Sequence, residues 1–303
     1  MWNEQASRDF LDPTILAGLA GMPLMARRPM RGAVSGKHTS PNRGASVEFA
    51  EYRKYVPGDD LRRLDWRAHG RSDRYYVKEF EADTNLRCCL VVDTSGSMGF
   101  GSGSLTKLDY ARRIAAAVGY LAVQQGDAVG LSCLAAGIVE HLPPRRNPSH
   151  LRAVFDVLER VRPTGETELV DVLHELAETT QQAALVIVIS DFFDDPERLK
   201  SCFEHLRFRK HDVSLFHLLD PKEISFDFQR PTRFLDMEGG TSIFADTGEI
   251  ADRYLSAIHE YLEQMHDVVM QTNTDYMRVT IDEPYQDALT RFLTRRATAR
   301  SVR

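Results

Sequence analysis

Uninterrupted apolar runs recur along the last two-thirds of the chain and end abruptly at polar residues. Such runs are typical of strands buried on both faces of a parallel sheet, whereas half-exposed strands alternate apolar and polar positions. The strongest runs cover residues 87–93, 128–134, 184–191 and 213–219, and two weaker ones, expected at an edge of the sheet, cover 138–142 and 232–237.

Amphipathic stretches separate these runs, with apolar residues at helical spacing. Ser149 is expected to cap the second of them. Because strands that alternate with helices usually pair side by side in one sheet, the pattern predicts an α/β fold with a doubly wound, mostly parallel sheet. The stretches cover residues 105–122, 149–161, 169–179, 196–209, 254–269 and 285–296.

The segment before residue 86 has a different character. A short helix is expected at 13–24, and Gly, Arg, Tyr and Asp dominate residues 31–87, where 47–49 and 75–80 alternate like exposed strands. This composition predicts a small β-rich N-terminal appendage. The expected division is an appendage with its helix at 1–85, the α/β domain at 86–275, and a C-terminal helix with a basic tail at 276–303.

The composition is that of an ordinary soluble protein, with 43% hydrophobic and 27% charged residues in 303. No stretch approaches the roughly 20 apolar residues that span a bilayer, and no basic segment opens a signal peptide. The four cysteines lie in apolar or helix-like segments without metal-ligand spacing, so buried thiols are expected. We therefore expect a cytoplasmic location and no transmembrane segment.

The net charge of −6 hides an asymmetry along the chain. Residues 27–87 carry 14 Lys and Arg against 9 Asp and Glu, whereas the remainder carries 24 against 35. The basic residues are interleaved with acids, which favours internal and surface ion pairs over a nucleic-acid site. No nucleic-acid partner is expected.

Oxygen-bearing side chains follow the strongest predicted strands. Asp93, Ser95 and Ser97 come directly after the 87–93 run, Asp191 ends the 184–191 run, and Thr167 precedes a helix. Ligands of open α/β folds bind at the carboxyl edge of the sheet, where these residues would meet if their strands are neighbours. Hydroxyls and carboxylates suit Mg²⁺, with Mn²⁺ or Ca²⁺ as alternatives, and the absence of His and Cys argues against zinc.

The order and setting of these five residues resemble the von Willebrand factor A domain with its metal-ion-dependent adhesion site. The resemblance covers roughly residues 86–270. It implies a Rossmann-like fold and a divalent ion bound by the two serines and commonly by the threonine. It also implies recognition of a protein partner that supplies an Asp or Glu to the metal.

The preceding segment resembles the bacterial family known as domain of unknown function fifty-eight. The matching residues include Arg53, Tyr55 and Pro57-Gly58-Asp59-Asp60, followed by Asp65-Trp66 and Glu79-Phe80-Glu81. The resemblance implies a MoxR-type AAA+ ATPase as partner. It also implies the role of a non-enzymatic, metal-dependent protein-interaction adaptor in the assembly or maturation of protein complexes.

Other interpretations remain open. Ser95 and Ser97 could cap a helix, with Asp93 and Asp191 as solvated acids at strand ends. A metal-dependent phosphoester hydrolase is the enzymatic alternative, although no water-activating base is identified. The chain could also be a structural subunit in which the ion only stabilises a loop. The preferred hypothesis assigns no catalytic residue and no organic-cofactor site.

Overall fold

The structure is a computed structural model that describes residue 8 and residues 10–27, 48–54, 76–81, 86–166, 168–228, 230–240 and 242–301. The chain divides into two compact units, one of residues 1–27 with 87–303 and one of residues 28–86. In the second unit, β1 (Glu48–Lys54) and β2 (Tyr76–Glu81) pair antiparallel, which places strands where the alternating segments predicted them. The turn and the Asp65-Trp66 segment between them lie outside the described residues.

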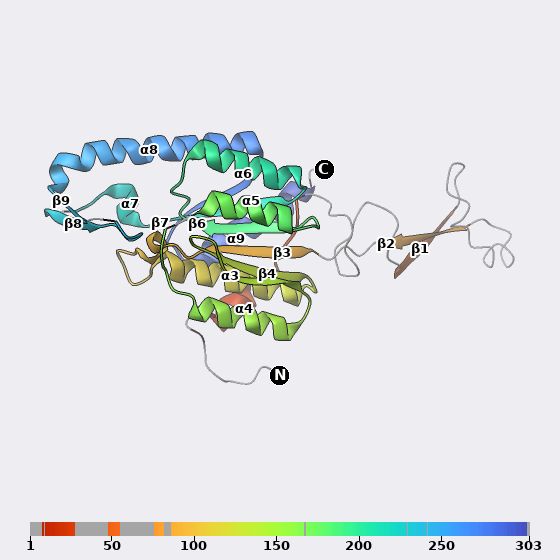
Figure 1. Cartoon of the computed structure of the whole chain (residues 1–303). Helices are drawn as coiled ribbons and strands as arrows, with labels where there is room; N and C mark the ends of the chain where they lie inside the picture. Colours follow the sequence, from red (N-terminus) through yellow and green to blue (C-terminus); the bar gives the residue numbers. More distant parts are fainter. Residues whose placement is uncertain are drawn as a thin grey trace. The chain divides into compact units, whose positions relative to one another are not determined.

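The larger unit is built on a six-stranded sheet with the order β10-β7-β6-β3-β4-β5 (Figure 1). Every neighbouring pair is parallel except β4 with β5, so the sheet is mostly parallel, as predicted. The strands are β3 (Arg87–Asp93), β4 (Ala128–Leu134), β5 (Ile138–Arg145), β6 (Leu185–Ser190), β7 (Asp212–Leu219) and β10 (Asp275–Thr280).

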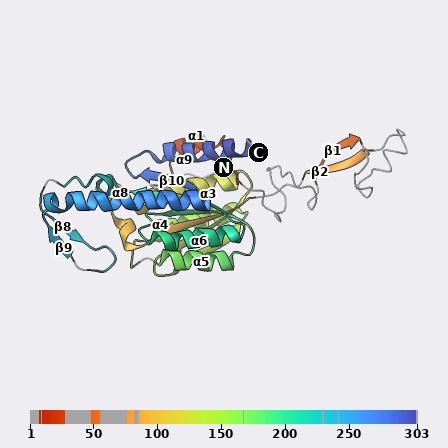
Figure 2. The same cartoon turned by 90° about the horizontal axis from the view of Figure 1, so that it is seen from above.

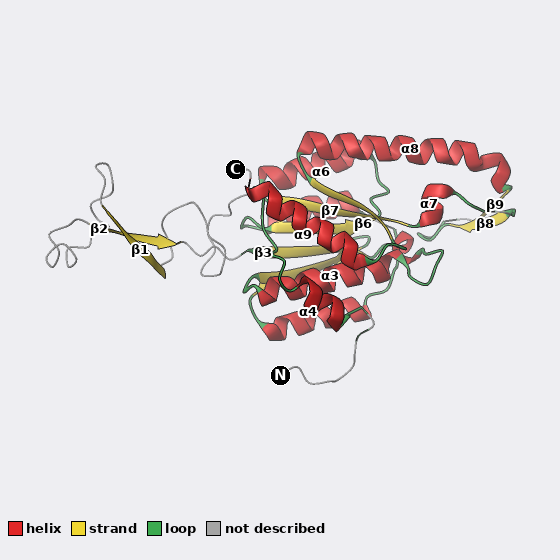
Figure 3. Ribbon diagram, turned by 180° about the vertical axis from the view of Figure 1, so that it is seen from behind, coloured by secondary structure: helices red, strands yellow, loops and turns green. Residues whose placement is uncertain are grey.

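Helices cover both faces of this sheet (Figures 2 and 3). On one face lie α1 (Pro13–Leu19), α3 (Lys107–Gln124), α4 (Pro148–Arg160) and α9 (Tyr285–Ser301). On the other lie α5 (Leu169–Thr179), α6 (Pro196–Phe208) and α8 (Thr247–Thr272). The predicted α/β architecture with helices on both faces is therefore confirmed.

The central strands β3 and β6 are buried almost throughout, which explains their uninterrupted apolar sequences. The helix after β3 packs on one face of the sheet, and the helix after β6 packs on the other. In open α/β sheets, ligands usually bind at the carboxyl ends of strands where the connections reverse in this way. The candidate residues follow these two strands.

Two local predictions were wrong. Asn147, not Ser149, caps α4, because Pro148 occupies the first helical position and the Asn147 side chain accepts from the Ser149 N–H at 2.8 Å. The 232–237 strand does not join an edge of the main sheet. Instead, β8 (Thr232–Leu235) pairs with β9 (Ser242–Ala245) in a separate hairpin beyond the carboxyl ends of the main strands.

Both terminal segments pack with the α/β unit. Arg296 of α9 is 1% exposed and donates to the Met25 carbonyl at 2.6 Å and the Ser214 hydroxyl at 2.6 Å. It also forms ion pairs with Asp212 of β7 and Asp275 of β10. This buried arginine connects an N-terminal segment, two strands and the last helix, so residues 10–27 and 276–301 are part of the same folded body.

Candidate functional site

The carboxyl end of β3 is fixed to the neighbouring strand at Thr94, between the candidate residues Asp93 and Ser95. The backbone N–H and the hydroxyl of Thr94 both donate to the Leu134 carbonyl of β4, at 2.6 and 2.8 Å. Asp93 then turns back on its own chain, and its carboxylate accepts from the Ser95 N–H at 2.9 Å. Strand pairing and a local turn therefore orient Asp93 and direct the following loop across the sheet edge.

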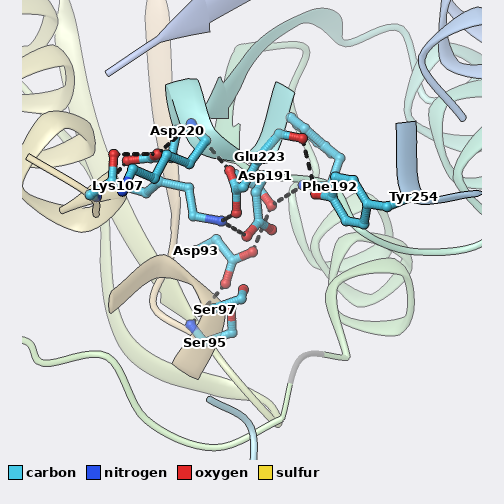
Figure 4. A network of polar contacts seen from close by, with 12 residues as sticks. Asp93, Ser95, Ser97, Lys107, Asp191, Phe192, Asp220, Glu223 and Tyr254 are labelled. Carbon is cyan, nitrogen blue, oxygen red and sulfur yellow. Dashed lines mark hydrogen bonds and ion pairs between the residues drawn. The ribbon is translucent and has the colours of Figure 1, made fainter. Parts of the chain in front are cut away.

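The two serines lie side by side. Ser95 and Ser97 flank the first residue of the short 3₁₀ helix η2 (Gly96–Gly99), and their hydroxyl oxygens are 3.1 Å apart (Figure 4). Ser95 is fully buried, yet its side chain makes no capping hydrogen bond at the start of η2. The capping interpretation thus fails for Ser95, whose hydroxyl pairs with that of Ser97 instead.

The end of β6 supplies the other half of the site. Ser190 donates its hydroxyl to the Asp93 carboxylate at 2.6 Å and accepts from the Phe192 N–H at 2.9 Å. Phe192 is fully buried and has a φ of 51°, a left-handed conformation that is uncommon for a bulky residue. Tyr261 of α8 donates to the Phe192 carbonyl and thereby supports this turn. Asp191 lies within this braced segment.

A buried lysine accompanies Asp191. Lys107, the first residue of α3, is 1% exposed, and its ammonium lies 2.6 Å from an Asp191 oxygen and 2.7 Å from a Glu223 oxygen (Figure 4). Glu223 is in turn held by the helix α7 (Pro221–Ser225), where it accepts from the Asp220 N–H at 2.7 Å in a capping box. The lysine thus joins the sheet edge to two helices.

Negative charge outweighs positive charge around Asp93. Burial and the nearby negative charge of Asp191 raise the pKa of Asp93 to about 6, while hydrogen bonds from Ser190 and Ser95 act in the opposite direction. Burial would lower the pKa of Lys107, but the carboxylates of Asp191 and Glu223 outweigh it and raise that pKa. Within the described residues, no cationic side chain forms an ion pair with Asp93. The Asp93 carboxylate therefore lacks a compensating cation there.

The structure brings together four of the five predicted site residues, namely Asp93, Ser95, Ser97 and Asp191. Thr167 lies outside the described residues. Its loop is anchored at Gly165, whose carbonyl accepts from the Gly96 N–H at 2.9 Å.

Three neighbouring polar residues, Ser190, Lys107 and Glu223, were not predicted. Asp220 and Glu223 have the spacing of a capping box, and Ser190 ends an apolar run, so both had a weak local signal. The position of Lys107 had none, because it depends on contacts across 84 residues.

The donor set suits a hard divalent cation. Two hydroxyl oxygens 3.1 Å apart lie beside the carboxylates of Asp93 and Asp191, and these are the oxygen ligands that Mg²⁺, Mn²⁺ and Ca²⁺ prefer. No group of three or more His, Cys, Asp or Glu in the described residues has a metal-holding arrangement. That finding concerns sites rich in charged or soft ligands, whereas half the donors here are hydroxyls.

Three relatives share sequence over most of the chain. One is an uncharacterized protein of Mycobacterium bovis and two are uncharacterized proteins of Mycobacterium tuberculosis. Each is 27% identical over 235 residues, which cover 77% of this chain and 74% of the relative. No helix among the described segments is both long and apolar enough to cross a membrane.

Two solved structures resemble the fold. BatB from Bacteroides thetaiotaomicron matches with a TM-score of 0.49 and 18% identity over 71% of this chain and all of the other. An aerotolerance-related membrane protein from Bacteroides fragilis matches with a TM-score of 0.46 and 19% identity over 70% of this chain. A family model described as "Protein of unknown function DUF58" matches residues 51–262, and the chain therefore belongs to the DUF58 family.

Proposed function

We propose that this DUF58 protein is a non-enzymatic adaptor that recognises a protein partner through a divalent metal ion, most simply Mg²⁺. The observation that carries the proposal is the pair of hydroxyls of Ser95 and Ser97, 3.1 Å apart beside the oriented carboxylate of Asp93. The motif resembles the metal-ion-dependent adhesion site of von Willebrand factor A domains. Such an ion, when bound, would supply a positive centre that attracts a carboxylate of the partner.

Each residue of the site has a distinct task in this proposal. Ser95 and Ser97 would contact the ion through their hydroxyls, which carry no charge and leave its positive charge largely unneutralised. Asp93 is oriented by the Ser95 N–H and the Ser190 hydroxyl, and supplies negative charge at the sheet edge. Lys107 occupies one oxygen of Asp191 and so reduces the negative charge available from this carboxylate. A cation at this site would therefore favour an additional acidic ligand.

The resemblance of the 53–81 segment to its family suggests a MoxR-type AAA+ ATPase as the partner, with a role in the assembly or maturation of protein complexes. The partner's Asp or Glu would approach the carboxyl edge of the sheet, where the loops after β3 and β6 meet. Metal-dependent phosphoester hydrolysis is the enzymatic alternative. It needs a water-activating base beside the ion, and no described residue is assigned that role.

The test is an affinity capture of partners from the native cell extract with the full chain. Wild type, Ser95→Ala and Ser104→Ala are each used in Mg²⁺ and in EDTA. Ser104 is exposed and outside the site, so it controls for loss of a serine hydroxyl from the same region. A partner held by wild type and Ser104→Ala in Mg²⁺, but lost in EDTA and with Ser95→Ala, is the expected result.

The same partners in every condition would overturn metal-dependent recognition. Turnover of p-nitrophenyl phosphate that requires Mg²⁺ and disappears in Asp191→Asn, with the fold retained, would instead favour the hydrolase.

A further inference from the structure

The loop of the β8–β9 hairpin lies directly against the serine loop. If position 96 carried a Cβ atom, that atom would lie 2.0 Å from the Met237 carbonyl oxygen and 3.2 Å from the Glu238 nitrogen. A Cβ at Gly99 would likewise meet the Met237 side chain at 3.2 Å. Gly96, between the two candidate serines, therefore permits a backbone approach that other residues would block. The hairpin loop thus covers the candidate metal loop.

The hairpin loop is built to present Glu238. The Asp236 carboxylate accepts from the Glu238 N–H at 2.9 Å, which closes a tight turn of the Asx type. Gly239 follows with a φ of 107°, a conformation that side chains rarely adopt. This local chemistry holds the backbone of Glu238 in place at the tip of the hairpin, next to the serine loop.

The Glu238 side chain interacts with groups of the candidate site. The pKa of Glu238 is raised, chiefly by burial and also by the negative charge of Asp191. Hydrogen bonds from the hydroxyl and the backbone of Ser97 act in the opposite direction. Glu238 is thus close enough to Ser97 to bond it and close enough to Asp191 to be repelled by it. A carboxylate between a candidate metal ligand and another acid has the chemistry expected of the acidic ligand of a partner.

We propose that Glu238 is an internal ligand of the metal site, which takes the place of the partner's Asp or Glu until the hairpin moves away. This inference rests on the proposed function. It adds a form of autoinhibition. Glu238 occupies the ligand position that the partner's carboxylate would take, so a partner must displace the β8–β9 loop to bind. The partner's carboxylate would then replace the Glu238 carboxylate on the metal, and no covalent bond of the chain would change.

The hairpin is not part of the main sheet. Its two strands have four residues each and pair only with each other, and such isolated pairs are marginally stable. Three of its apolar side chains are largely in solvent, with exposed fractions of 63% for Leu235, 65% for Ile243 and 73% for Phe244. Segments with little buried apolar surface open at low free energy. The hairpin is held over the site by its contact with the serine loop and by Phe234, whose ring packs against Phe226 and Phe228 with centroids 5.7 and 5.3 Å apart.

Titration of the full chain with Mn²⁺, followed by the electron paramagnetic resonance signal of the free ion, tests this inference. Wild type is compared with Glu238→Gln and with Glu263→Gln. Glu263 is an exposed acid on α8, so its substitution removes the same charge at a distance from the hairpin. The titration is repeated with sodium acetate, a carboxylate small enough to enter an open ligand position.

If Glu238 is an internal ligand, Glu238→Gln binds Mn²⁺ at least about tenfold more weakly than wild type and Glu263→Gln, the lower end of what loss of a metal-site partner costs. Acetate then strengthens Mn²⁺ binding by Glu238→Gln and leaves that of the other two unchanged. Equal Mn²⁺ affinities with equal responses to acetate would overturn the internal ligand and leave the metal site standing. Failure of wild type itself to bind Mn²⁺ would overturn both proposals.

Discussion

The Lys107 ammonium lies 2.6 Å from the Asp191 carboxylate, and both side chains are almost completely buried. The same ammonium lies 2.7 Å from Glu223 of α7. A buried charge without a partner is costly, so the lysine and the two acids depend on one another. The ion pair joins the start of α3 to the end of β6, which places both beside the serine loop.

Replacement of Lys107 by Met should therefore destabilise the protein strongly. It leaves two buried carboxylates without their cation, and breaking a buried pair in this way costs about 3–5 kcal/mol. Urea unfolding in EDTA measures the loss. Lys200→Met is the control, because Lys200 forms only a 3.9 Å surface pair with Glu197, and such pairs contribute about 0–1 kcal/mol. Equal losses in the two variants would show that the buried pair is not a stabilising unit.

Asp93 should make the stability of the metal-free protein depend on pH. Its folded-state pKa is about 6, above the ordinary Asp pKa of about 3.9, so the folded state binds this proton more tightly than the unfolded state. The contribution is present below about pH 4 and is lost as the pH rises to about 6. Asp93→Asn removes this loss, on the order of 3 kcal/mol, and should unfold at a higher urea concentration than wild type at pH 7.5 in EDTA.

At pH 4 the gap between Asp93→Asn and wild type should close, and Mg²⁺ at pH 7.5 should reverse the order by stabilising wild type alone. Urea unfolding across this pH range, with and without Mg²⁺, provides the measurement. A stability difference between the two proteins that does not change with pH would contradict the raised pKa.

Gly96→Ala should disrupt the contact between the serine loop and the hairpin. The added methyl group would overlap the Met237 carbonyl, so one of the two segments must shift, and forced overlaps of this kind cost about 1–3 kcal/mol. Thermal unfolding measures the cost, and limited proteolysis measures exposure of the hairpin, which should be cut faster. Gly103→Ala is the control, since nothing lies within 4 Å of a Cβ there. Identical cleavage rates in both variants would contradict the close approach.

Arg296→Leu should weaken the connection of both terminal segments to the core. It removes the ion pairs with Asp212 and Asp275 and leaves these buried acids without their cation, which should cost about 3–5 kcal/mol. The neighbouring Arg295 has a side chain 59% exposed, so Arg295→Leu should cost about 1 kcal/mol or less. Urea denaturation of the two variants compares them. Similar midpoints would mean that the buried network does not hold the termini.

Structural features that depend on neighbouring residues in the sequence were predicted most reliably. The buried strands β3 and β6 have continuous apolar runs, and each run ends at a candidate acid, so Asp93 and Asp191 could be placed at one sheet edge from their spacing and the fold class. The Ser149 cap failed because Pro148 fixed the helix start one residue earlier. The strand β10 was missed. Its six residues mix apolar and polar side chains, and each of them pairs with a residue of β7 that lies 61 positions earlier in the sequence.

Contacts between segments that lie far apart in the sequence could not be predicted from the pattern of apolar and polar residues. In the sequence, Lys107 is an ordinary residue at the start of a predicted helix. Its burial beside Asp191 and Glu223 becomes visible only when α3 is placed next to the end of β6 and α7. Glu238 lies in a polar turn between two short strands, where acids are common and usually solvated. Its place beside Ser97 depends on the close approach permitted by Gly96, which the sequence alone does not reveal.

The central claim is that the serine loop and the strand-end acids hold a divalent cation. Anomalous diffraction from crystals of the full chain grown with Mn²⁺ tests it most directly. We expect one strong anomalous peak at bonding distance, about 2.0–2.2 Å, from the hydroxyls of Ser95 and Ser97, and its loss in Ser95→Ala crystals. A peak elsewhere on the protein, or none at the end of β3 in saturating Mn²⁺, would contradict it.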